Sequence, residues 1–96
     1  MIKQQEIVRL WQELSHLAQL GVFDDSVHCV THYRPSKPMR YRDYTKIVYV
    51  LFKSDGTKKM RHEHVSIKHE LETWAKWHRT VRYRAIKRQL NALDES

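Results

Sequence analysis

The chain has few of the residues that break or cross-link small proteins: one cysteine, two prolines and two glycines in 96 residues. A lone cysteine excludes an intramolecular disulfide and is typical of a reducing compartment. The longest apolar run, residues 47–52, is far too short to cross a bilayer, and the N-terminal sequence shows no apolar secretory-signal region. These features predict a cytoplasmic protein, and the small size favours a bacterium or its phage or plasmid as the source.

Acidic residues are scarce in two stretches of the chain. Residues 34–62 carry nine basic residues against two acidic ones, and residues 76–88 carry six basic residues and no acid. The first 33 residues have the opposite balance, with two basic and four acidic residues. The net charge is +7 and the pI is about 9.8. This uneven charge predicts a positive potential over part of the surface, and therefore a polyanionic partner.

The length predicts a single domain over residues 1–96. Its first part reads as a helix that ends at Gly21, a residue suited to a helix C-terminus. The apolar stripe expected on this helix is Ile7, Leu10, Trp11, Leu14, Leu17 and Ala18. A second helix is expected from Ile67 to about Leu93, with Ser66 as its N-terminal cap.

The stripe expected on the second helix is Ile67, Leu71, Trp74, Val81 and Ala85. It then drifts to Ile86, Leu90 and Leu93, which predicts that the last turns leave the core or dock on another subunit. If Trp74 lies in the core, Trp74→Ala should lower the free energy of unfolding by about 3–5 kcal/mol.

Residues 26–34, 44–53 and 58–65 read as three strands. Asp55 and Gly56 are typical of a two-residue type I′ turn, which would pair positions 51 with 60, 49 with 62, and 47 with 64. In that register His62 and His64 share the core face with Ile47. The opposite face then holds Val48, Val50 and Phe52 among charged residues.

The fold class predicted is therefore α+β: a two-layer α-β-β-β-α chain with a three-stranded antiparallel sheet and two helices on one face. This order of elements is similar to that of the double-stranded-RNA-binding domain, which recognises A-form geometry largely by shape. The similarity puts the basic loop 35–43 where that family enters a minor groove. The family's glycine-rich loops and lysine-rich signature are missing, so the similarity is one of topology alone.

Seven histidines and Cys29 raise the possibility of a metal site or a nucleophile. His28 and His32 are expected on one strand face with Val30, and Cys29 on the other. The two histidine pairs, His28 with His32 and His62 with His64, are then expected on opposite sheet faces. No C-x-x-C or H-E-x-x-H spacing occurs, and the carboxylates are scattered. We expect no metal, no cofactor and no catalytic residues, and classify the chain as a non-enzyme.

The basic residues carry the functional prediction. Those on the second helix are expected on the face opposite the apolar stripe, so that Arg79→Ala should barely change stability. Those in loop 34–46 lie among tyrosines, and arginine with tyrosine suits phosphate contacts and stacking on bases. The alternative is that these residues have no binding role and form only a solvated helix face and a charged surface loop. The expected nucleic-acid contacts are Arg34, Lys37, Arg40, Tyr41, Arg42, Lys76, Arg79, Tyr83, Arg84 and Lys87.

The sequence thus predicts a small basic nucleic-acid-binding module that contacts duplex DNA or RNA mainly through phosphates. The alternative is a phage- or plasmid-encoded inhibitor or adaptor, like an anti-CRISPR protein, that docks on an acidic surface of a host protein or nucleoprotein complex. Its contact surfaces would be the outer sheet face and the tail from Leu90 to Leu93. A homodimer through the same surfaces is compatible with the sequence, and attachment to a membrane is not expected.

Overall fold

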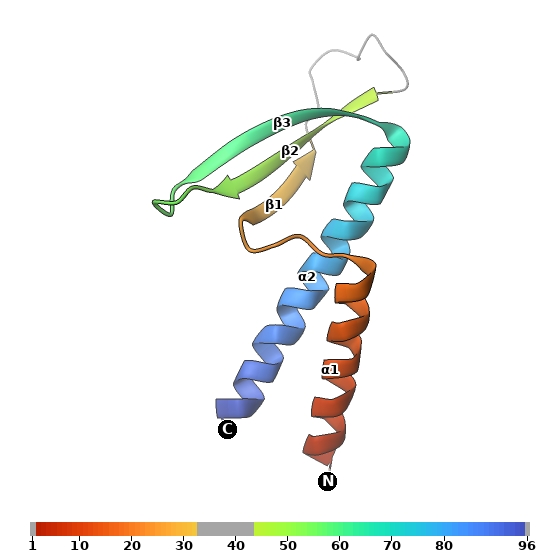
Figure 1. Cartoon of the computed structure of the whole chain (residues 1–96), viewed down its shortest axis with the longest axis vertical. Coiled ribbons are helices and arrows are strands. Elements are labelled where there is room, and N and C mark those ends of the chain that lie inside the picture. Colours follow the sequence, from red (N-terminus) through yellow and green to blue (C-terminus); the bar gives the residue numbers. More distant parts are fainter. Residues whose placement is uncertain (1, 33–43, 96) are drawn as a thin grey trace. The chain divides into compact units, whose positions relative to one another are not determined.

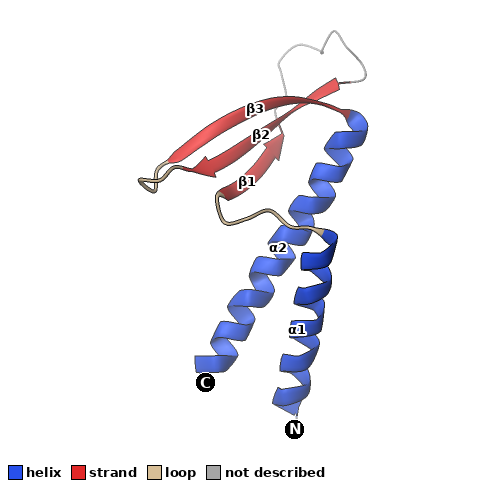
Figure 2. Cartoon of the chain, in the orientation of Figure 1, coloured by secondary structure: helices blue, strands red, loops and turns tan. Residues whose placement is uncertain are grey.

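The computed structural model describes residues 2–32 and 44–95 (Figure 1). Its elements are α1 (Ile2–Leu20), β1 (Val27–His32), β2 (Tyr44–Phe52), β3 (Lys58–Ser66) and α2 (Ile67–Glu95). The α+β class and the order of helices and strands are confirmed, and the ends of β2, β3 and α2 lie within two residues of those predicted (Figure 2). Residues 33 and 34, expected at the end of the first strand, lie outside the described residues, as does loop 35–43.

The chain divides into two compact units. Unit 1 comprises Met1–Val22 with His78–Ser96, and unit 2 comprises Phe23–Trp77. The long helix α2 contributes its first part to unit 2 and its second part to unit 1. Each unit has its own hydrophobic cluster. The single domain remains a prediction from length.

The capping signals expected at the helix ends are confirmed. The N–H of Gly21 donates to the carbonyl oxygen of Leu17 at 3.0 Å, and Gly21 has a φ of +110°. This left-handed conformation ends α1 and favours glycine. At the other helix, the N–H of His69 donates to Oγ of Ser66 at 3.2 Å, so Ser66 caps the start of α2.

The three strands form one antiparallel sheet in the order β1-β2-β3, with β2 in the centre (Figure 2). The hairpin between β2 and β3 is closed by a three-residue loop, and the predicted two-residue type I′ turn is wrong. The N–H of Gly56 donates to the carbonyl oxygen of Lys53, and the N–H of Lys53 donates to that of Thr57. Gly56 has a φ of +86°, but Asp55 has no positive φ, which a type I′ turn would require. The pattern is that of a type I turn followed by a glycine bulge.

The longer loop moves β3 by one position relative to the predicted register. The observed pairs are Leu51 with Lys59, Tyr49 with Arg61, Ile47 with Glu63, and Val48 with His62. A slip of one residue turns every side chain of a strand to the other face. His62 and His64 therefore lie on the face opposite the core, and their predicted place on the core face is wrong.

A bulge in β1 overturns a second prediction about faces. Val27 pairs with Leu51 and Cys29 with Val50, so two steps along β1 match one step along β2 and His28 is the extra residue. Val30 then pairs with Tyr49 on the core face, while the ring of His28 contacts Phe52 of the opposite face. His28 and Val30 do not share a face. His28 lies on the same side of the sheet as His62 and His64.

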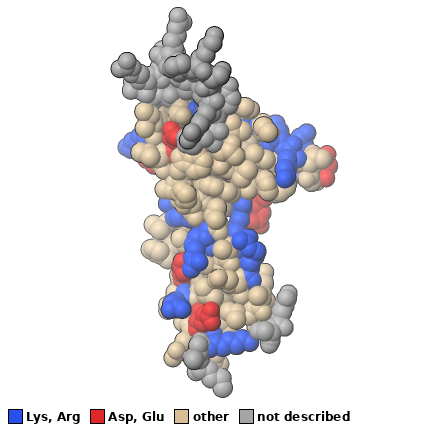
Figure 3. All heavy atoms as spheres, turned by 180° about the vertical axis from the view of Figure 1, so that it is seen from behind, with Lys and Arg blue, Asp and Glu red and all other residues tan. Residues whose placement is uncertain are grey.

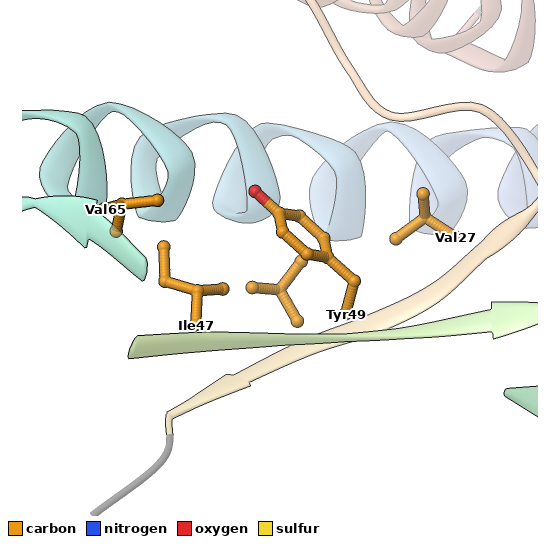
Figure 4. Packing of buried hydrophobic residues seen from close by; sticks show 5 residues of the cluster. Val27, Ile47, Tyr49 and Val65 are labelled. Atoms are coloured by element: carbon orange, nitrogen blue, oxygen red, sulfur yellow. The ribbon is translucent and has the colours of Figure 1, made fainter. Parts of the chain in front are cut away.

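The cluster of unit 2 lies between one face of the sheet and the first part of α2 (Figure 4). Its buried members are Val27, Val30, Ile47, Tyr49 and Val65, and Phe23, Leu51, Trp74 and Trp77 pack against them. Ile47 is fully buried. The predicted core face of the central strand is thus confirmed, and apolar residues from all three strands share it.

The cluster of unit 1 joins α1 to the second part of α2. Leu10, Leu14, Ile86 and Leu90 are buried, and Ile7, Leu17, Tyr83 and Leu93 pack around them. The tail from Leu90 to Leu93 is therefore used inside unit 1. On α1, Trp11 is 55% exposed, so its predicted place in the buried stripe is wrong. Ala18, expected in the same stripe, is also exposed.

The buried face of α2 also differs from the predicted stripe. Ile67, Leu71 and Val81 are exposed by 49%, 66% and 47%, whereas Thr73 and Thr80 are buried. Thr73 tolerates burial because its Oγ1 donates to the carbonyl oxygen of His69 at 2.9 Å. The buried stripe of α2 includes these two threonines, so a search for apolar residues at helical spacing does not find it. Within the described residues, neither helix contains a stretch long and apolar enough to cross a membrane.

Candidate nucleic-acid interface

The ten predicted contact residues fall into two sets. Arg34, Lys37, Arg40, Tyr41 and Arg42 lie outside the described residues. Lys76, Arg79, Tyr83, Arg84 and Lys87 lie on α2. Lys87 is exposed, whereas the other four are half-buried. The predicted place of these residues on the exposed face opposite the apolar stripe is therefore wrong for all but Lys87.

Arg79 has a structural role at the end of α1. Its Nε donates to the carbonyl oxygen of Gly21 at 2.8 Å, and its Nη2 donates to that of Leu20 at 3.3 Å. The last carbonyls of a helix have no partner within the helix and favour a nearby positive charge. The guanidinium of Arg79 supplies both the donors and the charge. It is held by the protein's own backbone, contrary to the expected exposed position.

Tyr83 belongs to the hydrophobic cluster of unit 1 rather than to an exposed stacking surface. It lines a hollow of about 180 Å³ with Trp11, Leu14 and Leu90, and Lys87 lies at the same hollow. The Nζ of Lys87 is 5.5 Å from the centroid of the Tyr83 ring. Cation–π contact of this kind positions an ammonium group without neutralising it.

Lys76 is placed similarly in unit 2, with its Nζ 4.5 Å from the centroid of the Phe23 ring. The charge of Arg82, in contrast, is compensated by a carboxylate within the chain. Its Nε and Nη2 donate to the two carboxylate oxygens of Glu13 at 2.7 and 2.9 Å. These hydrogen bonds from Arg82 lower the pKa of Glu13 below its ordinary value and raise the pKa of Arg82. The sequence gives no sign of this pair, because 69 positions separate the partners.

The β2–β3 hairpin carries exposed cations that are not among the ten predicted contacts. Lys53, Lys58 and Lys59 flank its loop and are all exposed. Figure 3 shows basic side chains gathered at this end of the sheet. The carboxylate of Asp55 accepts hydrogen bonds from the N–H and Oγ1 of Thr57, which lower its pKa. The signal that could have found this cluster is the pattern of three lysines around a tight turn that contains a single acid.

Arg61 faces the core side of the sheet, as Lys59 does, but its side chain packs on an aromatic ring. Its guanidinium carbon is 4.9 Å from the centroid of the Tyr49 ring. Its Nη2 is also 3.8 Å from a carboxylate oxygen of Glu63, and both side chains are well exposed. An exposed ion pair at this distance contributes little to stability. Arg61 is therefore a packing residue with a partly compensated charge.

Histidine and cysteine side chains are the candidate metal ligands of the chain. In the described part of the chain, no group of three or more histidine, cysteine, aspartate or glutamate side chains is placed to hold a metal ion. Cys29 is a free, half-buried thiol on the outer face of the sheet. Comparisons with protein-family models, with curated proteins and with solved structures found no match to this chain.

Proposed function

We propose that the protein is a small, basic, non-enzymatic module that binds nucleic acid mainly through its phosphates. The observation that carries the proposal is the exposed lysine cluster of the β2–β3 hairpin, made up of Lys53, Lys58 and Lys59. Ammonium groups at the end of a hairpin can approach the backbone of a duplex without disturbing either core. Each phosphate that they neutralise releases counterions, so binding depends steeply on salt.

The ion pairs within the protein leave a positive excess. Of the described cations, Arg82 is paired with Glu13, and Arg61 lies near Glu63. Hydrogen bonds from Arg79 to carbonyl oxygens orient its charge without cancelling it. Lys87 and Arg88 add exposed charge on α2. The net charge of +7 supports attraction of a polyanion.

The test is the salt dependence of binding to a short labelled duplex, followed by fluorescence anisotropy between about 50 mM and about 200 mM salt. The double variant Lys58→Gln/Lys59→Gln should bind more weakly, and its slope of log K against log salt should fall by about 2 for B-DNA. The matched control Arg9→Gln/Lys68→Gln removes the same charge from two other exposed positions. It should change the slope much less. No binding by the parent protein at the low salt concentration would refute the proposal.

The alternative function, an inhibitor or adaptor that docks on a host protein or nucleoprotein complex, is favoured by one feature of α1. Val8 and Trp11 are each 55% exposed, and tryptophan is enriched among residues that dominate protein interfaces. A partner captured from nuclease-treated lysate by the parent protein and lost with Trp11→Gln would support the adaptor. Capture that disappears on nuclease treatment would support nucleic-acid binding.

A further inference from the structure

The outer face of the sheet carries an apolar patch next to the lysine cluster. We call it the hairpin patch and define it as Cys29, Val50, Phe52 and Met60. Cys29, Val50 and Met60 form one row across the three strands. Phe52 lies two residues beyond Val50 on the same face of β2, toward the hairpin loop. The buried cluster of unit 2 lies on the opposite face, so these side chains are not needed for that core.

The hairpin patch is open to solvent at its aromatic end. Phe52 is 41% exposed and Met60 is 66% exposed, whereas Val50 and Cys29 are half-buried. The ring of His28 meets the ring of Phe52 edge to face, with centroids 5.0 Å apart and an interplanar angle of 65°. The β1 bulge brings this second ring to the same side of the sheet. Two aromatic rings therefore adjoin at the surface, one of them on the central strand.

Positive charge borders the patch within the sheet, and the nearest acids, Asp24 and Asp55, lie in the adjoining loops. Lys58 pairs directly with Phe52 across the hairpin, so their side chains share a face. Lys46 lies on the same face farther from the loop. On the described strands, the sole carboxylate side chain is that of Glu63, which faces the core side.

This combination suits a partner with flat apolar rings and negative charges in alternation. We infer that the hairpin patch binds single-stranded nucleic acid, with an unpaired base stacked on Phe52 and a neighbouring phosphate at Lys58. The inference rests on the proposed nucleic-acid binding and specifies its form. A duplex buries its base faces in its own stack, whereas a single strand can present them to an aromatic side chain. Lysine beside the patch favours this partner over a protein, because lysine is depleted in protein interfaces.

The test compares a labelled oligothymidylate with a labelled duplex of the same length at low salt. Phe52→Leu removes the ring but keeps apolar volume at an exposed position, so the fold should be retained, which circular dichroism verifies. It should weaken oligothymidylate binding about tenfold and leave duplex binding unchanged. Phe52→Tyr keeps a ring and should retain affinity. Lys58→Gln should weaken binding of both probes, because phosphates are common to both.

A second measurement locates the contact without a substitution. An oligothymidylate that contains a photoreactive uracil should cross-link to the peptide that includes Phe52, as identified by mass spectrometry. Equal binding by the parent protein and Phe52→Leu, with cross-links elsewhere, would overturn the inference but leave phosphate binding in place. The inference also fails if Phe52→Leu affects only capture of a nuclease-resistant protein partner. If the parent protein binds neither the oligothymidylate nor the duplex at low salt, both proposals are refuted.

Discussion

The guanidinium of Arg79 donates from Nε to the carbonyl oxygen of Gly21 at 2.8 Å, across 58 positions of sequence. This contact places a cation at the C-terminal end of α1, where the helix dipole is negative. Gly21, which accepts this hydrogen bond, has the left-handed conformation that ends the helix. A residue that the charge pattern marks as a ligand contact is thus part of the scaffold of unit 1.

We expect Arg79→Ala to lower the free energy of unfolding by about 1–2 kcal/mol, because two carbonyl oxygens lose a charged donor. Chemical denaturation followed by circular dichroism measures this change. Arg88→Ala, at an exposed position on the same helix, should have an effect below about 0.5 kcal/mol. Equal stability of the two variants would show that the Arg79 contact is unimportant in solution.

Gly56 should be sensitive to substitution because its φ is +86°. Gly56→Val should destabilise the hairpin by about 1–2 kcal/mol, since a β-branched residue disfavours this conformation. Gly56→Asn should cost less, because asparagine tolerates the left-handed region. Apart from the adjacent residues, a Cβ at this position meets no atom within 4 Å, so a clash with other parts of the described chain is excluded as the cause. Thermal melting of the two variants decides the matter, and a more stable Gly56→Val protein would argue against the bulged turn.

The Glu13–Arg82 pair predicts a dependence of stability on acid. The pKa of Glu13 is lowered in the folded protein, chiefly by the hydrogen bond from Arg82. Its contribution is therefore complete above the ordinary value of 4.5 and is lost as the pH falls through the lowered value. Unfolding should be followed by denaturation at several pH values from neutral to strongly acidic. Glu13→Gln should lose less stability over the acidic range than the parent protein, and parallel curves would contradict the prediction.

The core of unit 1 predicts a contrast between two positions on α2. Ile86 is fully buried, and Ile86→Ala should lower the free energy of unfolding by about 2–5 kcal/mol through lost burial and a cavity. Val81 is 47% exposed, so Val81→Ala should cost less than about 1 kcal/mol. The sequence instead predicts that Val81 is the core residue, because Val81 fits the apolar period that starts at Ile67. Denaturation curves of both variants distinguish the two faces of the helix.

Local signals explain how much of the fold the sequence predicts. Helix caps depend on one or two residues, and Ser66 and Gly21 have the hydrogen bonds that their residue types favour. The run of apolar residues in β2 likewise predicts a central strand, because both faces of such a strand must be covered. The hairpin is also marked correctly, but its loop length is not. Type I′ and bulged type I turns both accept Asp55 and Gly56, and they differ by one residue in register.

The candidate site was harder to predict than the fold. Basic residues on α2 were identified by charge alone, and charge does not show which partner each side chain meets. Arg82 meets Glu13 and Arg79 meets the end of α1, although both partners are distant in sequence. The lysines of the hairpin stayed exposed because residues near a tight turn have few neighbours.

The amino-acid sequence by itself determined the helices, the strands, their order and the excess of positive charge, because each depends on composition or on neighbours within a few residues. Only the tertiary structure decided which face of β3 and of α2 is buried, and which cations are held by the chain itself. Those outcomes depend on a single residue of loop length and on contacts between segments far apart in the chain. No local pattern of residues records such contacts.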